Sequence, residues 1–154
     1  MMKKLSFIFY KILFFFNKLF KFVTKKSILI HFKDFLENDS YQEISINQKK
    51  TKFFSPNKIT DWRVKTFFSK EPETLEWIDT FNDKENTIFW DIGANIGLYS
   101  IYNTIKNNNS QTIAFEPSTS NLRILSRNIS INNFEKKIKI LPTPLTNKKN
   151  SFLI

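Results

Sequence analysis

Apolar positions in the second half of the chain form short runs that alternate with longer segments of helical character. The three runs are β-prone, and we expect them to be buried parallel strands. They span residues 87–90, 112–115 and 137–141, and the helical segments span residues 98–106 and 118–131. This β-α-β-α-β order with short connections predicts an α/β fold whose parallel strands are joined by right-handed crossovers.

The middle of the chain has a weaker pattern that predicts scaffold elements. Residues 41–47 alternate between apolar and polar positions, and a second β-prone run follows at residues 51–54. Together they predict a small hairpin, and residues 55–57 form a loop after it. Pro72 suits the first turn of a helix that we expect to end near residues 82–83.

The first 33 residues are mostly apolar and are interrupted by lysines at a regular spacing. Four lysines recur at every seventh position, namely Lys4, Lys11, Lys18 and Lys25. On a helix they lie close to one face, so the arm is expected to be a basic, partly amphipathic helix. The division is imperfect, because three aromatic residues fall among the lysines: Phe7, Phe14 and Phe22.

Two roles of this arm remain open at the level of sequence. Such a helix can lie in a membrane interface with its lysines on anionic headgroups, or it can pack its aromatic side on the protein's own core. The longest uninterrupted apolar run is Ile12 to Phe16. A helix that spans a membrane needs about 20 apolar residues, so we do not expect the arm to span one.

The net charge of +10 comes mainly from the arm, because residues 1–33 hold eight lysines and no acidic residue. The rest of the chain is nearly neutral, which argues against a nucleic-acid partner, since a phosphate-binding groove needs clustered cations. The chain has no cysteine, so disulfides and thiolate metal sites are excluded, and we predict no metal site. These features fit a cytoplasmic protein with possible peripheral membrane contact through residues 1–33.

Candidate chemistry gathers where the first predicted strand ends. Gly93 and Gly97 are the only glycines in the chain, and both fall in the turn that follows Asp91. Glycine lets a backbone bend sharply and lets a ligand approach closely. Ligands of parallel sheets bind beyond the carboxyl ends of the strands, so this turn is the expected binding site.

An acidic residue, Glu116, ends the next predicted strand, 19 residues after Gly97. A carboxylate there can accept both hydroxyls of a ribose. The loop spacing differs from the G-x-G-x-x-G pattern of dinucleotide folds, and no Walker-type lysine follows it. Asp91 would repel a pyrophosphate but would attract the cationic methionine part of S-adenosylmethionine, which is the cofactor that we predict.

The same residues could instead have purely structural roles. Asp91 can cap the following helix, the glycines can simply make a turn, and Glu116 can be an exposed strand end. The joint placement of all of them in one β-α-β unit favours the cofactor site.

Two segments give the chain a resemblance to the FkbM-type methyltransferases. They run from Phe89 to Ser100 and from Ala114 to Pro117, and the second is followed by Asn121, Leu125, Asn128 and Asn132. The upstream residues 62–64 and 70–77 also look like segments of some members. The resemblance implies a Rossmann-like class I methyltransferase domain and O-methyl transfer to a hydroxyl of a sugar or secondary metabolite.

The resemblance also implies site residues. The methionine part of S-adenosylmethionine would be held by Asp91, Gly93, Ala94, Asn95 and Gly97, and the ribose by Glu116. No residue is identified as catalytic. The only histidine, His31, lies far upstream, where a surface or packing role is expected.

The family's domain continues beyond three strands, whereas this chain ends at Ile154. We therefore expect residues 1–33 to be the arm, 34–83 the hairpin and lead-in helix, and 84–154 an incomplete methyltransferase domain. Such a fragment is expected to be inactive alone and poorly stable, because a half-sheet leaves a raw edge and exposed apolar surface.

The expected partner is a small-molecule or glycan hydroxyl acceptor. One alternative is a non-catalytic fragment that binds a nucleoside, a partner protein or a membrane. The other alternative is a nicotinamide-dependent oxidoreductase, which the loop spacing disfavours.

Overall fold

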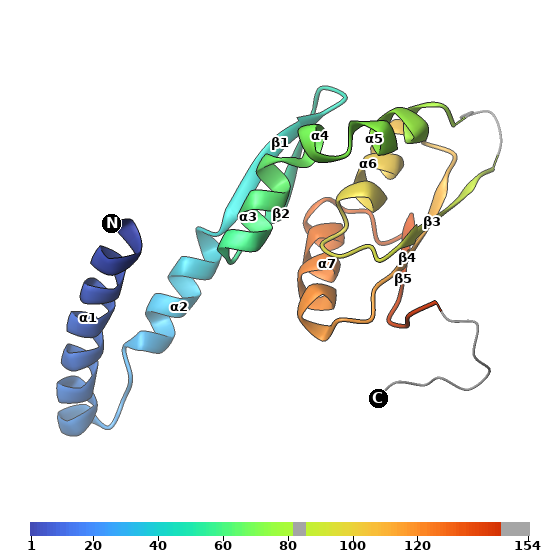
Figure 1. The fold of residues 1–154 in the computed structure, drawn as a ribbon. Helices are drawn as coiled ribbons and strands as arrows, with labels where there is room; N and C mark the ends of the chain where they lie inside the picture. The colour runs from blue at the N-terminus through green and yellow to red at the C-terminus, as the bar shows by residue number, and fades with distance from the viewer. Residues whose placement is uncertain (82–85, 146–154) are drawn as a thin grey trace. The chain divides into compact units, whose positions relative to one another are not determined.

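The computed structural model describes residues 1–81 and 86–145 (Figure 1). The chain divides into two compact units, residues 1–40 and residues 41–154. The first unit extends past the expected arm because a second helix follows the first. The lead-in helix was expected to end near residues 82–83, but it ends earlier, at Asp79, with Thr80 as its C-cap.

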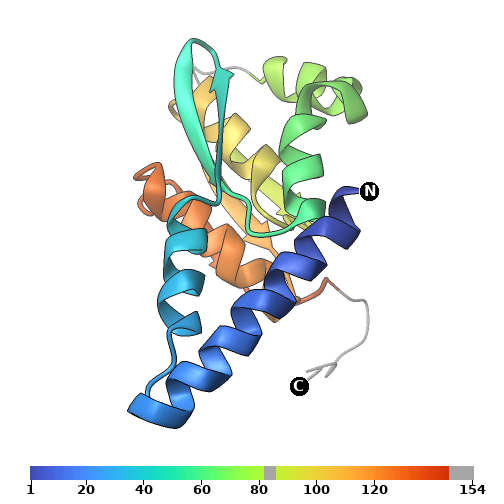
Figure 2. The same cartoon turned by 90° about the vertical axis from the view of Figure 1, so that its left-hand side faces the viewer.

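Two helices, α1 (Met2–Thr24) and α2 (Leu29–Asn38), form the first unit and meet at a short turn (Figure 2). The predicted basic helix is confirmed by α1, whereas α2 was not predicted. Asn17 joins them, because its Oδ1 accepts hydrogen bonds from the Ser27 hydroxyl at 3.0 Å and from the Ile28 N–H at 2.9 Å. These bonds satisfy backbone donors at the start of α2 that have no partner within the helix.

The second unit begins with an antiparallel hairpin of β1 (Tyr41–Ile46) and β2 (Lys49–Phe54), as predicted. Its turn consists of Asn47 and Gln48, whose φ angles of 48° and 64° are typical of a type I′ turn. The turn takes only two residues, so β2 begins earlier than the predicted position 51.

Three short helices follow: α3 (Lys58–Lys65), α4 (Phe67–Lys70) and α5 (Pro72–Asp79). Asn57 caps α3, since its side chain accepts hydrogen bonds from the backbone of Ile59 and Thr60, each at 3.0 Å. Pro72 begins α5 as expected, but α3 and α4 were not predicted.

The rest of the unit is a three-stranded sheet with two crossover helices. The strands are β3 (Ile88–Ile92), β4 (Gln111–Phe115) and β5 (Ile138–Leu141), and the helices are α6 (Leu98–Lys106) and α7 (Thr119–Ile131). All pairings are parallel, in the order β3-β4-β5. The predicted α/β class and its β-α-β-α-β order are therefore confirmed.

Only one face of this sheet is covered by α6 and α7 (Figure 1). Phe89 and Asp91 of β3 point to the covered face and are buried. Ile88, Trp90 and Ile92 alternate with them and are 63%, 54% and 61% exposed. The prediction that β3 is fully buried is thus wrong for one face, because no described helix packs there.

The hairpin is joined to the sheet layer through α7. The Arg127 guanidinium lies 3.9 Å from the ring centroid of Phe54, and its Nε donates a hydrogen bond to the Tyr41 hydroxyl at 2.7 Å. Cation–π and hydrogen-bond contacts from one side chain therefore attach both strands of the hairpin to α7.

Close packing of α6 against α7 depends on Gly97, the N-cap of α6. Its φ is 86°, and a Cβ atom at this position would lie 2.5 Å from Cδ1 of Leu125, which is fully buried. Gly93 also has a positive φ, of 78°, but a Cβ atom there would meet nothing within 4 Å.

These two glycines form a matched pair for a stability test. We expect Gly97→Ala to lower the free energy of unfolding by about 3 kcal/mol, from left-handed backbone strain and overpacking together. Gly93→Ala should cost only about 1 kcal/mol, from the backbone alone. Urea unfolding of both variants would measure the difference, and equal losses would refute the close α6–α7 contact.

Candidate functional site

The loop of residues 93–97 lies across the carboxyl ends of β3 and β4. The backbone N–H groups of Gly93 and Ala94 both donate to the carbonyl of Phe115, each at 2.9 Å. Three loop residues have positive φ: Gly93 (78°), Asn95 (55°) and Gly97 (86°). Asparagine tolerates this conformation better than most residues with a side chain. The loop is therefore bent sharply and tied to the end of β4.

Glu116 holds the loop from the next strand end. Its Oε2 accepts the Asn95 N–H and its Oε1 accepts the Ser118 N–H, both at 2.8 Å. The residue is only 5% exposed, so the alternative of an exposed strand end is wrong. A carboxylate has about four acceptor positions, so each oxygen can still accept another hydrogen bond.

Asp91 is also buried, at 7% exposure, and faces α6. The Ser100 hydroxyl donates to its Oδ2 at 2.5 Å. Burial raises the pKa of the Asp91 carboxyl, and the hydrogen bonds from Ser100 oppose that effect in part. In this position Asp91 is bonded to the first turn of α6 through the Ser100 side chain, although the N-cap of that helix is Gly97.

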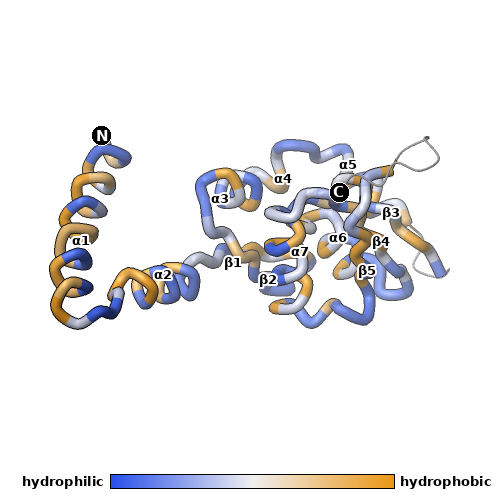
Figure 3. The backbone as a smooth tube through the Cα atoms, turned by 90° about the horizontal axis from the view of Figure 1, so that it is seen from below, coloured by the Kyte–Doolittle hydropathy of each residue, from blue (hydrophilic) through white to orange (hydrophobic). Residues whose placement is uncertain are grey.

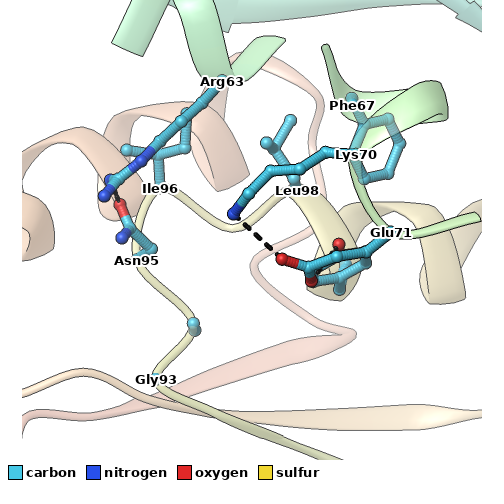
Figure 4. Close-up of a pocket in the computed structure, with 10 residues that line it drawn as sticks. Arg63, Phe67, Lys70, Glu71, Gly93, Asn95, Ile96 and Leu98 are labelled. Carbon is cyan, nitrogen blue, oxygen red and sulfur yellow. Dashed lines mark hydrogen bonds and ion pairs between the residues drawn. The ribbon is translucent and has the colours of Figure 1, made fainter. Parts of the chain in front are cut away.

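A cavity of about 180 Å³ opens over the loop (Figure 4). It is lined by residues from α3, α4, the loop and the start of α6: Arg63, Phe67, Lys70, Glu71, Gly93, Ala94, Asn95, Ile96, Leu98 and Tyr99. Of the predicted site residues, Gly93, Ala94 and Asn95 therefore line this cavity. Asp91, Gly97 and Glu116 do not line it, and each contacts other parts of the protein instead.

Charged groups of both signs stand at this cavity. Arg63 donates from Nη1 to the Asn95 side-chain oxygen, and Lys70 forms an ion pair with Glu71 at 2.9 Å. The Tyr99 hydroxyl donates to the other Glu71 oxygen at 2.7 Å. The hydrogen bonds from Lys70 and then Tyr99 lower the pKa of Glu71, so it stays ionised at neutral pH. The cavity thus offers both a cationic and an anionic side.

No role in a binding site was predicted for Arg63, Lys70, Glu71 or Tyr99. Arg63, Lys70 and Glu71 lie in the upstream segments quoted for the resemblance, and Tyr99 lies in the segment around the loop. That resemblance was the only available signal. The short helices α3 and α4 carry Arg63 and Lys70 to the loop, and neither helix was predicted.

A second cavity, of about 190 Å³, shares Gly93 with the first. Its lining is largely apolar and comprises Ile92, Gly93, Phe115, Pro117, Thr143, Pro144 and Leu145. Gly93 therefore lies between a charged cavity and an apolar one, with open space where a side chain would be. A ligand with one zwitterionic end and one flat apolar end matches this pair.

Asn128 of α7 contacts the loop and is fully buried. Its Oδ1 accepts the Phe54 N–H at 2.6 Å, and its Nδ2 donates to the Ile96 carbonyl at 2.8 Å. The same side chain therefore binds the hairpin and the loop. This residue was part of the quoted resemblance without a role.

The strand order and parallel pairing place the second unit among Rossmann-like α/β folds. No protein-family model matches the chain, so the FkbM-type resemblance stays a prediction. Over 80 residues the chain is 36% identical to the methyltransferase sdnD of Sordaria araneosa. That stretch is 52% of this chain and 31% of that protein, so the chain spans about a third of its relative.

Two solved structures show partial similarity to the chain. The P. horikoshii TYW2 in complex with MeSAdo is 19% identical, with 69% of this chain and 37% of that chain covered at a TM-score of 0.48. The SAM-dependent methyltransferase from Agrobacterium tumefaciens is 9% identical, with 68% and 33% covered at a TM-score of 0.45.

The buried carboxyl of Asp91 makes stability depend on pH. Its folded-state pKa lies above the ordinary value of 3.8. Below pH 3.8 the group is protonated whether the chain is folded or not, and above the raised pKa the folded state carries a buried charge. Asp91→Asn should therefore stabilise the chain increasingly as the pH rises from about 4 to the raised folded-state pKa, by about 1.4 kcal/mol for each pKa unit of the shift.

Thermal melting of the wild type and the variant across that range is the measurement. Ser100→Ala is the matched variant, because it removes a donor to the charged carboxylate. It should lower the melting temperature more at pH 7 than at pH 3.5. A constant difference between Asp91→Asn and wild type at all pH values would refute the burial argument.

Proposed function

We propose that this chain carries the cofactor-binding part of an S-adenosylmethionine-dependent methyltransferase. The observation that carries the proposal is the loop from Asp91 to Gly97, which bends over the ends of two parallel strands beneath a charged cavity. The 36% identity with a fungal methyltransferase over 80 residues supports the same conclusion. Activity, substrate and partners of the whole protein are part of this proposal.

The residues present suit the parts of this cofactor. The methionine carboxylate would face Arg63, and its ammonium group would face Glu71, across the polar cavity. The ribose hydroxyls would donate to the open acceptor positions of Glu116. The adenine would enter the apolar cavity beside Phe115 and Pro117. Asp91 and Gly97 would act by fixing the loop.

When bound, S-adenosylmethionine would supply a methyl group on a sulfonium, ready for in-line attack by an acceptor oxygen with the thioether S-adenosylhomocysteine as leaving group. The cavity contributes binding and orientation to that step. Burial raises the pKa of Tyr99, and the pKa of Glu71 is lowered, so neither is a general base suited to neutral pH. Acceptor positioning and proton removal would come from residues outside the described site.

The acceptor that we propose is a hydroxyl of a sugar or secondary metabolite, on the basis of the FkbM-type resemblance. We further propose that this chain by itself binds the cofactor without turning it over. The alternative, a non-catalytic nucleoside-binding module, also predicts that the chain binds the cofactor. Cofactor binding together with methylation by the chain alone would contradict both.

Calorimetric titration with S-adenosylhomocysteine tests the cofactor class, with NADH as the competing ligand. Binding of S-adenosylhomocysteine alone is expected, and Glu116→Ala should weaken it by roughly 10- to 100-fold through loss of a charge-assisted hydrogen bond. Glu135→Ala removes an exposed carboxylate and should leave binding unchanged. Binding of NADH alone would overturn the methyltransferase proposal.

The role of Arg63 can be isolated with two ligands. Arg63→Ala should weaken S-adenosylhomocysteine binding by roughly 10- to 100-fold, since a hydrogen-bonded charge is lost. Binding of 5′-methylthioadenosine, which has no amino-acid part, should change little. Lys58→Ala, an exposed change on the same helix, is the control. Equal losses for both ligands would place Arg63 outside the carboxylate site.

A further inference from the structure

The surface of α1 divides into a wide apolar arc and a narrower basic sector. With about 100° between successive residues, the arc covers roughly 160° of the helix and contains no polar residue. It comprises Met2, Leu5, Ile8, Phe9, Ile12, Leu13, Phe15, Phe16, Leu19, Phe20 and Val23. Figure 3 shows apolar residues recurring along the whole length of α1.

The phenylalanines that interrupt the basic sector are paired with its lysines. The Lys11 Nζ lies 5.2 Å from the ring centroid of Phe7. The same distance separates Lys18 from Phe14, and a similar one, 5.6 Å, separates Lys25 from Phe22. Each ring therefore lies under an ammonium group. These pairs account for the three aromatic residues that fall among the lysines in the sequence. Because each ring is paired with a lysine, the arm is more strongly amphipathic than its sequence alone indicates.

Within its own unit the apolar arc has no cover. Asn17 is the only buried residue of α1, and it binds the start of α2 from the polar side of the helix. Among the arc residues Phe9 is 63% exposed and Phe16 is 56% exposed. Since Asn17 fixes the start of α2 at a position outside the arc, α2 cannot fold over the arc without breaking these bonds.

We propose that α1 lies flat on the surface of a membrane that contains anionic lipids. The arc would enter the acyl boundary, and the lysines would reach the headgroups. Charge complementarity selects this occupant, because residues 1–33 carry eight lysines and no acidic residue. Among the described residues, no helix has the combination of length and apolarity needed to cross a bilayer, which fits a surface position.

Other occupants fit the same surface less well. A second copy of α1 could cover the arc but would leave the lysines of both copies without anionic partners. A nucleic acid would bind the lysines but would leave the apolar arc in water. A bilayer surface with anionic headgroups satisfies both the arc and the basic sector at once.

Co-sedimentation of the full chain with vesicles tests the proposal. Vesicles of phosphatidylcholine alone are compared with vesicles that also contain phosphatidylserine. The double variant Phe9→Ser/Phe16→Ser removes apolar area from the arc, and Lys11→Ala/Lys18→Ala removes charge. The control, Ile59→Ser/Phe68→Ser, removes two exposed apolar side chains from the second unit.

The wild type should bind the phosphatidylserine vesicles, and the control should bind equally well. The phenylalanine variant should bind at least tenfold more weakly, because two aromatic side chains no longer enter the acyl boundary. The lysine variant should lose roughly fivefold for each lysine, on anionic vesicles only.

Two outcomes would overturn the proposal. Absence of wild-type binding to anionic vesicles would remove the membrane as partner. Unchanged vesicle binding by the phenylalanine variant would show that the lysines alone make the contact, as they would with a nucleic acid. If that variant also melted at a lower temperature, the arc would belong to the protein's own core.

Discussion

One buried side chain, Asn128, connects the parts on which the candidate site depends. It lies on α7, accepts a hydrogen bond from the backbone of β2 and donates one to the loop at Ile96. An amide that is fully buried must have such partners, because an unpaired polar group costs about 1–3 kcal/mol. The hairpin, the crossover helix and the ligand-facing loop are therefore held in one arrangement. Leu125, one turn earlier on α7, requires the glycine at position 97 for the same close approach.

The site has two layers with different tasks. Asp91 bonds the first turn of α6 through Ser100, and Glu116 accepts two backbone N–H groups while keeping acceptor positions for a ribose. Arg63, Lys70 and Glu71, by contrast, place charges at the cavity. A loop held this firmly presents its backbone to a ligand at little further entropic cost. Gly93 lines both a charged cavity and an apolar one, and this arrangement suits a nucleoside joined to an amino acid.

Two exposed apolar surfaces among the described residues differ in character. The open face of β3 carries Ile88, Trp90 and Ile92. Strand β3 is also at the edge of the described sheet. The arc of α1 is different, because a sector of lysines borders it. A flat uncharged sheet face suits packing against other polypeptide, whereas an apolar arc beside cations suits an anionic interface.

The pattern along the chain is enough to predict the repeating β-α-β-α-β order, the hairpin, the basic helix and the loop between Asp91 and Gly97. These follow from local periodicity, from β-propensity and from glycine, all of which can be read along the chain. Burial of Glu116 and Asp91, by contrast, arises only on folding, as does the position of Arg63 and Lys70 beside the loop. The same holds for the bonds by which Asn17 joins α1 to α2. Such facts depend on contacts between residues far apart in the chain, and no local pattern encodes which side chains meet after folding.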